Sequence, residues 1–130
     1  MASIPEDLRY TTDHEWARHD DEVITVGITD HAQAQLGDVV YVELPEPGEE
    51  VTAGEPFGSV ESTKAVSELL APLSGKIADI NDSLSDTPEV VNDDPYGEGW
   101  MIRITPDDDT DWDGLMDSEA YAAHVEAEEG

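Results

Sequence analysis

The chain has 130 residues, and its 33 Asp and Glu against five Lys and Arg give a formal net charge of −28. Such a charge repels nucleic acid and anionic membranes, so both are poor candidate partners. Cysteine is absent, which excludes disulfides, iron–sulfur clusters and thiolate metal sites. The length predicts one domain, residues 1–130, with a small hydrophobic core.

The acidic residues are spread from Glu6 to Glu129 among apolar residues and are not gathered in one tail. This distribution favours solvation in very high salt over a local binding surface for cations or basic proteins. Molar salt shortens the Debye length to about 3 Å, so densely placed carboxylates become tolerable. The first residues lack the features of a signal peptide, and no apolar run approaches membrane-spanning length. We therefore expect a cytoplasmic protein from a halophilic organism.

Most of the chain is patterned as short strands separated by turn residues. The ranges with β-branched or alternating apolar residues are 21–29, 39–44, 56–61, 66–70, 75–80 and 99–105. Strands this close together in sequence favour an antiparallel sandwich or barrel over a doubly wound fold.

Helical patterns are confined to the edges of this strand-rich region. Asp30 is placed to cap a short helix that ends at Gly37. Thr87, which precedes a proline, is placed to cap a second helix, and Ser118 a third one at the C-terminal end. The acidic run 107–111 is expected to be a solvated connection.

One lysine stands between two strand-like runs, in the segment Ser62-Thr63-Lys64-Ala65, whose other residues are small. Without Asn-Gly or Gly-Gly, a two-residue turn is disfavoured, and a longer loop built on a type I turn fits. Lys64 is therefore predicted to stand exposed at a hairpin tip. An ordinary surface lysine is the alternative, but the only other lysine is Lys76, and one retained at a tip suggests use of its amine.

The segment Glu61-Ser62-Thr63-Lys64-Ala65 resembles the lipoylation site of glycine cleavage H proteins. It is unlike a biotin attachment site, where methionines flank the lysine. The lipoyl domains of 2-oxoacid dehydrogenases share the hairpin lysine but lack the other segments that resemble H proteins here. Those segments are 10–16 (YTTDHEW), 26–33 (VGITDHAQ), 37–47 (GDVVYVELPEP) and 92–101 (NDDPYGEGWM).

The resemblance implies a mostly β fold, a barrel-sandwich hybrid of two antiparallel sheets with short peripheral helices and a C-terminal helix. It implies lipoate joined to Lys64 as an amide. The arm would carry an aminomethyl group from the pyridoxal-phosphate enzyme glycine decarboxylase to the tetrahydrofolate-dependent aminomethyltransferase. The flavoenzyme dihydrolipoamide dehydrogenase would then reoxidise the dithiol. With a lipoylating enzyme, these are the expected partners of a monomeric carrier that is not itself an enzyme.

The resemblance also assigns site residues by position. Asp13, Glu15 and Glu68 match positions that line a cleft for the loaded arm. Asp13 stands where the family often has a hydroxyl residue, and Glu68 where Asp is common. Glu61 and Gly75 match positions associated with recognition by lipoylating enzymes, and Gly75 also has an ordinary explanation as a turn residue.

The histidines His14, His19, His31 and His124 show no metal-site spacing, such as a pair four residues apart on a helix. We therefore expect no metal site, with His14 and His31 structural.

Three other functions remain open. A lipoate relay would keep the carrier chemistry but donate the cofactor to other lipoyl domains. A small enzyme using an acid pair such as Asp13 and Glu15 would need a substrate cleft and perturbed carboxylates, which nothing in the spacing demands. An unmodified interaction module would show no mass addition on either lysine.

Overall fold

The structure is a computed structural model that describes residues 4–20, 22–107 and 110–129. Helices in these ranges are α1 (Asp30–Leu36), α2 (Ser83–Asp86), α3 (Val90–Asp93), α4 (Thr110–Asp113) and α5 (Ser118–Glu129). The strands are β1 (Arg9–Tyr10), β2 (Glu15–Asp20), β3 (Val23–Ile28), β4 (Val39–Glu43), β5 (Glu50–Val51), β6 (Pro56–Ser62), β7 (Val66–Leu70), β8 (Gly75–Ile80) and β9 (Ile102–Pro106).

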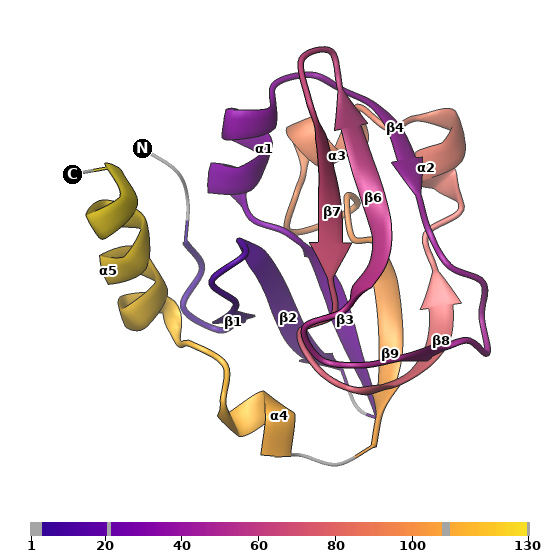
Figure 1. Cartoon of the computed structure of the whole chain (residues 1–130), viewed down its shortest axis with the longest axis vertical. Helices are drawn as coiled ribbons and strands as arrows, with labels where there is room; N and C mark the ends of the chain where they lie inside the picture. Colours follow the sequence, from indigo (N-terminus) through magenta and orange to yellow (C-terminus); the bar gives the residue numbers. More distant parts are fainter. Residues whose placement is uncertain (1–3, 21, 108–109, 130) are drawn as a thin grey trace.

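The strands form two sheets in which every pairing is antiparallel. One sheet has six strands in the order β1-β2-β3-β9-β8-β5, and the other has three in the order β4-β6-β7. Figure 1 shows the β6–β7 hairpin rising over the larger sheet, with α1 beside it and α5 on the outer side of β1. The two-sheet architecture expected from the sequence is therefore confirmed.

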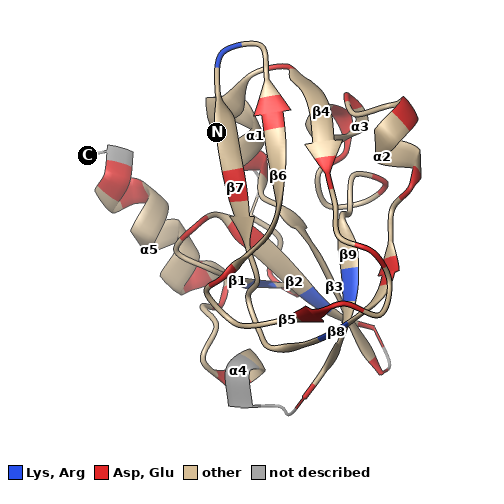
Figure 2. Cartoon of the chain, turned by 45° about the vertical axis from the view of Figure 1, so that its right-hand side comes forward, with Lys and Arg blue, Asp and Glu red and all other residues tan. Residues whose placement is uncertain are grey.

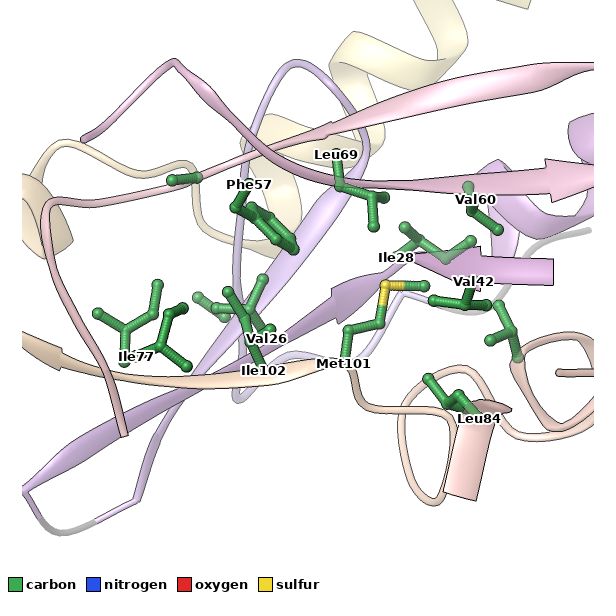
Figure 3. Packing of buried hydrophobic residues seen from close by; sticks show 14 of the residues in the cluster. Val26, Ile28, Val42, Phe57, Val60, Leu69, Ile77, Leu84, Met101 and Ile102 are labelled. Carbon is green, nitrogen blue, oxygen red and sulfur yellow. The ribbon is translucent and has the colours of Figure 1, made fainter. Parts of the chain in front are cut away.

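The main core lies between the two sheets. Figure 3 shows Phe57 and Leu69 of the small sheet above Val26 and Ile102 of the large sheet. All four side chains are buried, and each contributes on the order of 1.5–3 kcal/mol by leaving water. A second, smaller cluster lies under α5, and its buried members are Leu8, Tyr10, Trp16, Tyr121 and Val125.

The predicted strands are confirmed where the apolar pattern is strong. β7 and β8 have the predicted bounds, and β4 and β6 differ from theirs by one residue. The range 99–105 begins too early, because Gly97, Gly99 and Trp100 are tied into turns before β9. The pattern missed β2, since its sequence (EWARHD) is largely polar even though its first three residues are buried.

The helix ends need correction. α1 ends at Leu36 as predicted, but Asp30 is its first residue and its cap is Thr29, whose hydroxyl oxygen accepts a hydrogen bond from the Ala32 amide. Asp30 instead accepts a hydrogen bond from the Gln33 side chain. Thr29 is the cap because a capping oxygen must accept from an amide two or three residues further along the chain, and the Thr29 hydroxyl does so at Ala32.

Two further helix predictions were wrong in their start. Thr87 does not cap the start of a helix: it follows the end of α2, its hydroxyl donates to the carbonyl of Ser83 at the start of α2, and α3 begins only at Val90. Ser118 was predicted to cap the C-terminal helix, but it is the first residue of α5, and Asp117 provides the capping oxygen for the Ala120 amide. The run 107–111 was predicted to be a solvated connection, but α4 begins at Thr110, so residues 110 and 111 are helical. Residues 108–109 lie outside the described residues. No helix in the described ranges is long and apolar enough to cross a membrane.

Candidate functional site

The predicted hairpin tip is the loop of residues 63–65 between β6 and β7. The Ser62 amide donates to the Ala65 carbonyl over 2.8 Å, and the Ser62 hydroxyl oxygen accepts from the amides of Lys64 and Ala65 over 3.3 and 3.1 Å. Lys64 is exposed, and it is the blue segment at the top of Figure 2. The structure thus places Lys64 at the hairpin tip, on a backbone closed by hydrogen bonds.

The tip is also fastened to the segment that follows α1. The Thr63 amide donates to the Asp38 carbonyl over 3.1 Å. The Lys64 side chain passes over Gly37, where an added Cβ would lie 3.3 Å from the Lys64 Cε. Gly37 has a φ of +83°, in the left-handed region that favours glycine. A side chain at position 37 would therefore strain the backbone and crowd the lysine.

Glu61 stands in an exposed cross-strand row beside the tip. It pairs in register with Tyr41 on β4 and with Val66 on β7. Register partners in antiparallel sheets point to the same face, so the three side chains lie side by side. Tyr41 is 50% exposed and Val66 64% exposed, which leaves apolar surface next to the lysine.

Gly75 is not brought to the tip. It is buried at the start of β8, in the other sheet, where an added Cβ would lie 2.2 Å from the Thr105 carbonyl oxygen. The close approach of β8 to β9 therefore requires glycine at this position on packing grounds alone.

A cleft of about 300 Å³ opens next to the lysine, between the start of β2, α1 and β7. Ala65 and Val66 line it, so it begins directly after Lys64 in the chain. Asp13, Glu15 and Glu68 line it as well, and the structure therefore brings together the three acidic residues that the resemblance assigned.

Glu15 differs from the other two acids because it is only 2% exposed, whereas Asp13 and Glu68 are exposed. Its carboxyl oxygens accept hydrogen bonds from the Leu70 amide over 2.7 Å and from the Thr11 hydroxyl over 3.2 Å. Burial raises the pKa of Glu15 to about 8, against the opposing effect of these two donors. The cleft thus contains one carboxyl group that holds its proton near neutral pH.

One wall of the cleft is joined to the C-terminal helix through a group of residues that the sequence did not bring together. His14 lines the cleft, and its Nδ1 lies 2.8 Å from the hydroxyl of Tyr121 on α5. That hydroxyl lies 2.7 Å from Thr29 Oγ1, and the Tyr121 ring stacks on Tyr10 with centroids 4.6 Å apart. We call Tyr10, His14, Thr29 and Tyr121 the α5 corner.

Electrostatics agree with the buried character of the α5 corner. Burial lowers the pKa of His14 and raises the pKa of Tyr121, so the neutral form of each is favoured. Position along the chain gave no indication of this group, because His14 and Tyr121 are 107 residues apart.

The same region gathers groups that could hold a metal ion, although the spacing of the histidines in the sequence did not point to one. The candidate ligand atoms of His14, His31 and Glu128 all lie within 4.8 Å of one another. His19 lies elsewhere, with its ring edge-on to Trp112.

Residues 8–128 match the family model described as glycine cleavage H-protein. The chain belongs to the glycine cleavage H-protein family. It is 65% identical over 126 residues to the glycine cleavage system H protein of Anaeromyxobacter sp. (strain K), covering 97% of this chain and 98% of that one. It is 57% identical over 129 residues to the glycine cleavage system H protein of Rubrobacter xylanophilus, covering 99% and 100% of the two chains.

A solved structure of the family agrees with the fold. The crystal structure of a glycine cleavage system H protein from Mycobacterium marinum superposes with a TM-score of 0.86 at 43% identity. The match covers 94% of this chain and 98% of that chain. Both sheets and the helices around them are therefore features of an H-protein fold.

Proposed function

We propose that this chain is the lipoyl-bearing shuttle of the glycine cleavage system and that Lys64 carries the lipoyl group. The observation that carries the proposal is the position of Lys64, exposed on a closed hairpin loop at the mouth of a carboxylate-lined cleft. Family membership supports the same function, in which the H protein is a carrier component and not itself a catalyst. The whole chain, residues 1–130, would act as one carrier domain.

The carboxyl groups of the cleft are suited to bind a positively charged group carried on the lipoyl arm. Amide formation removes the charge of Lys64, and the aminomethyl group that the arm then receives brings a new amine. Glu68 and Asp13 offer exposed carboxylates to the protonated amine. Glu15 is buried and holds its proton near neutral pH, and a cation that enters the cleft stabilises its carboxylate form. We propose that docking of the loaded arm therefore displaces the Glu15 proton.

Recognition by other proteins is proposed for the exposed row beside the tip. Glu61, with Tyr41 and Val66 as neighbours, offers charge and apolar surface to the lipoylating enzyme. The remaining partners are glycine decarboxylase with pyridoxal phosphate, the tetrahydrofolate-dependent aminomethyltransferase and the flavoenzyme dihydrolipoamide dehydrogenase. A monomer leaves this row open to each of them in turn. For Gly75, we propose that any effect on lipoylation acts through the packing of β8 on β9.

The acidic surface is proposed to be an adaptation to high salt in the cytoplasm of a halophilic organism. Figure 2 shows Asp and Glu on many elements of the fold, whereas the blue segment at the hairpin tip lies apart from the other Lys and Arg. Screening at high salt makes this arrangement tolerable, because the carboxylates no longer repel one another over more than about 3 Å.

The test of attachment compares the two lysines. The wild-type chain, incubated with a lipoylating enzyme and lipoate, should gain the mass of one lipoyl group, and peptide mapping should place it on Lys64. Lys64→Arg should remain unmodified, whereas the control Lys76→Arg should be modified as the wild type is. Lipoate on Lys76, or on the Lys64→Arg chain, would overturn the assignment. A lipoylated chain that glycine decarboxylase cannot load would favour the relay function instead.

The test of docking is the decay of the loaded arm. The aminomethyl adduct should break down in water to formaldehyde and ammonia, and docking should slow this step. Glu15→Gln is expected to load normally but to release formaldehyde about 5- to 30-fold faster, which corresponds to about 1–2 kcal/mol of lost docking. Asp13→Asn and Glu68→Gln should act in the same direction.

Glu43→Gln, which changes an exposed acid of β4 outside the cleft, is the matched control and should decay at the wild-type rate. All rates are compared at equal salt and well below the thermal midpoint of each variant. Docking through these carboxylates is wrong if all three cleft variants decay as the control does.

A further inference from the structure

Three chain segments bring imidazole and carboxylate groups together at the outer edge of the α5 corner. His14 lies just before β2, His31 lies in α1, and His124 and Glu128 lie on α5. The candidate ligand atoms of His14, His31 and Glu128 lie within 4.8 Å of one another, and the His14 ring centroid lies 4.7 Å from that of His31 and 5.6 Å from that of His124. We propose that these residues form a binding site for one transition-metal ion, Zn²⁺ in the first place, which fastens α5 to the wall of the arm cleft.

The distances between donor atoms suit a single ion. His14 Nε2 lies 3.0 Å from Glu128 Oε2, and His124 Nε2 lies 2.6 Å from the same oxygen. Two ligands of a tetrahedral zinc ion, each bonded at roughly 2.0–2.1 Å, stand about 3.3 Å apart. Small side-chain movements therefore suffice to place an ion between Glu128 and the imidazoles.

The donor set indicates which metals fit. Two imidazoles and one carboxylate are a set that zinc uses in proteins, and a third imidazole from His124 or a water completes four ligands. His124 and Glu128 are four residues apart on α5, the spacing that places two ligands on one helix face. Mg²⁺ and Ca²⁺ prefer oxygen ligands, so they are poor occupants of this site.

His14 is held in the orientation that a ligand needs. Its Nδ1 lies 2.8 Å from the Tyr121 hydroxyl, and its Nε2 faces Glu128. Metal-binding histidines almost always have the second ring nitrogen hydrogen-bonded in this way, because the bond fixes the ring and its tautomer. The Tyr121 hydroxyl is itself positioned by Thr29 Oγ1 at 2.7 Å, in a buried environment.

The location explains what an ion would stabilise. The twelve residues of α5 include four Glu and no Lys or Arg, and its last turn carries no basic residue. Carboxylates near a helix C-terminus oppose the helix dipole, and like charges on one helix repel each other. A divalent cation bound by Glu128 and His124 offsets both effects and, through His14, connects α5 to the cleft.

The experiment measures zinc binding to the full chain carrying Lys64→Arg, so that arm sulfurs cannot contribute. The protein is stripped with a chelator and titrated with Zn²⁺ by calorimetry, in molar KCl with excess Mg²⁺ to occupy surface carboxylates. One saturable site per chain is expected, and Co²⁺ should give the visible absorption of a tetrahedral nitrogen and oxygen site. Zinc should also raise the thermal midpoint.

The variants distinguish a specific zinc site from general binding of cations to the acidic surface. In this background, His31→Gln and Glu128→Gln should each weaken zinc binding at least tenfold and remove the rise in thermal midpoint. His19→Gln is the matched control, since His19 contacts Trp112 and lies outside the cluster, and it should bind zinc as the parent does. Glu128 is 39% exposed, so its substitution keeps the test valid where a change at the buried His31 prevents folding. The absence of saturable zinc binding in Mg²⁺, or equal binding by the Glu128→Gln and His19→Gln chains, would overturn the proposal.

Discussion

The hairpin tip and the α5 corner are both next to the arm cleft, yet they are held in opposite ways. At the tip, exposed small residues are fixed by hydrogen bonds that Ser62 makes within three residues, plus one bond from Thr63 to Asp38. At the α5 corner, two buried tyrosines from opposite ends of the chain stack, and the hydroxyl of Tyr121 contacts His14 and Thr29. Disturbing the tip should therefore cost little stability, whereas disturbing the packed α5 corner should cost more.

The largest expected effect comes from Tyr121→Ala. Removing the ring abolishes the stack on Tyr10 and the contacts with His14 and Thr29, and it leaves a cavity in the smaller core. The free energy of unfolding should fall by about 3–5 kcal/mol, measured by denaturant titration. Lipoylation of Lys64 at temperatures where the variant is folded should be unchanged.

The control for this prediction is Tyr121→Phe, which keeps the ring and loses the hydroxyl. It should cost only about 0.5–1.5 kcal/mol. An equal loss in both variants would show that the hydroxyl contacts, and not the packed ring, hold the α5 corner together.

Added salt should stabilise α5 more than the hairpin tip, because α5 is strongly acidic. With four Glu and no Lys or Arg, α5 should open in dilute buffer and close as molar KCl screens its charges. Hydrogen exchange in the presence of a chelator should show α5 amides slowing at least tenfold between low and molar salt, with a smaller change in β6 and β7. The thermal midpoint of the whole chain should rise as well. An equal response in both regions, or none, would mean that the acidic composition serves another purpose.

The smallest effect is expected for Ser62→Ala at the tip. The hydroxyl holds the backbone on both sides of Lys64, so its loss should cost about 0.5–1.5 kcal/mol locally and slow lipoylation by less than about tenfold. The initial rate of lipoylation and the thermal midpoint are measured together. Ser85→Ala, which changes an exposed serine of α2 outside the hairpin and the cleft, should leave the rate unchanged. A fall in the thermal midpoint as large as that of Tyr121→Ala would contradict the local character of the tip.

The strand pattern could be predicted where side chains alternate in apolar character, as in β7 and β8. It could not be predicted for β2, because Glu15 and Trp16 are buried for separate reasons. Trp16 packs in the cluster under α5 and donates its ring N–H to the Pro95 carbonyl, while Glu15 accepts the Leu70 amide of the other sheet. Both contacts join residues that are more than fifty positions apart, so no local sequence pattern predicts them.

The sequence by itself determined the H-protein resemblance, the two-sheet fold class and the place of Lys64 at a hairpin tip. Each of these depends on residues that are neighbours in the chain, namely a short motif, alternating strands and a small-residue loop. Only the tertiary structure decided that Glu15 is buried with a raised pKa and that His14, His31 and Glu128 converge. Burial and convergence depend on which distant segments pack together, because desolvation and ligand geometry are set by neighbours in space and not in sequence.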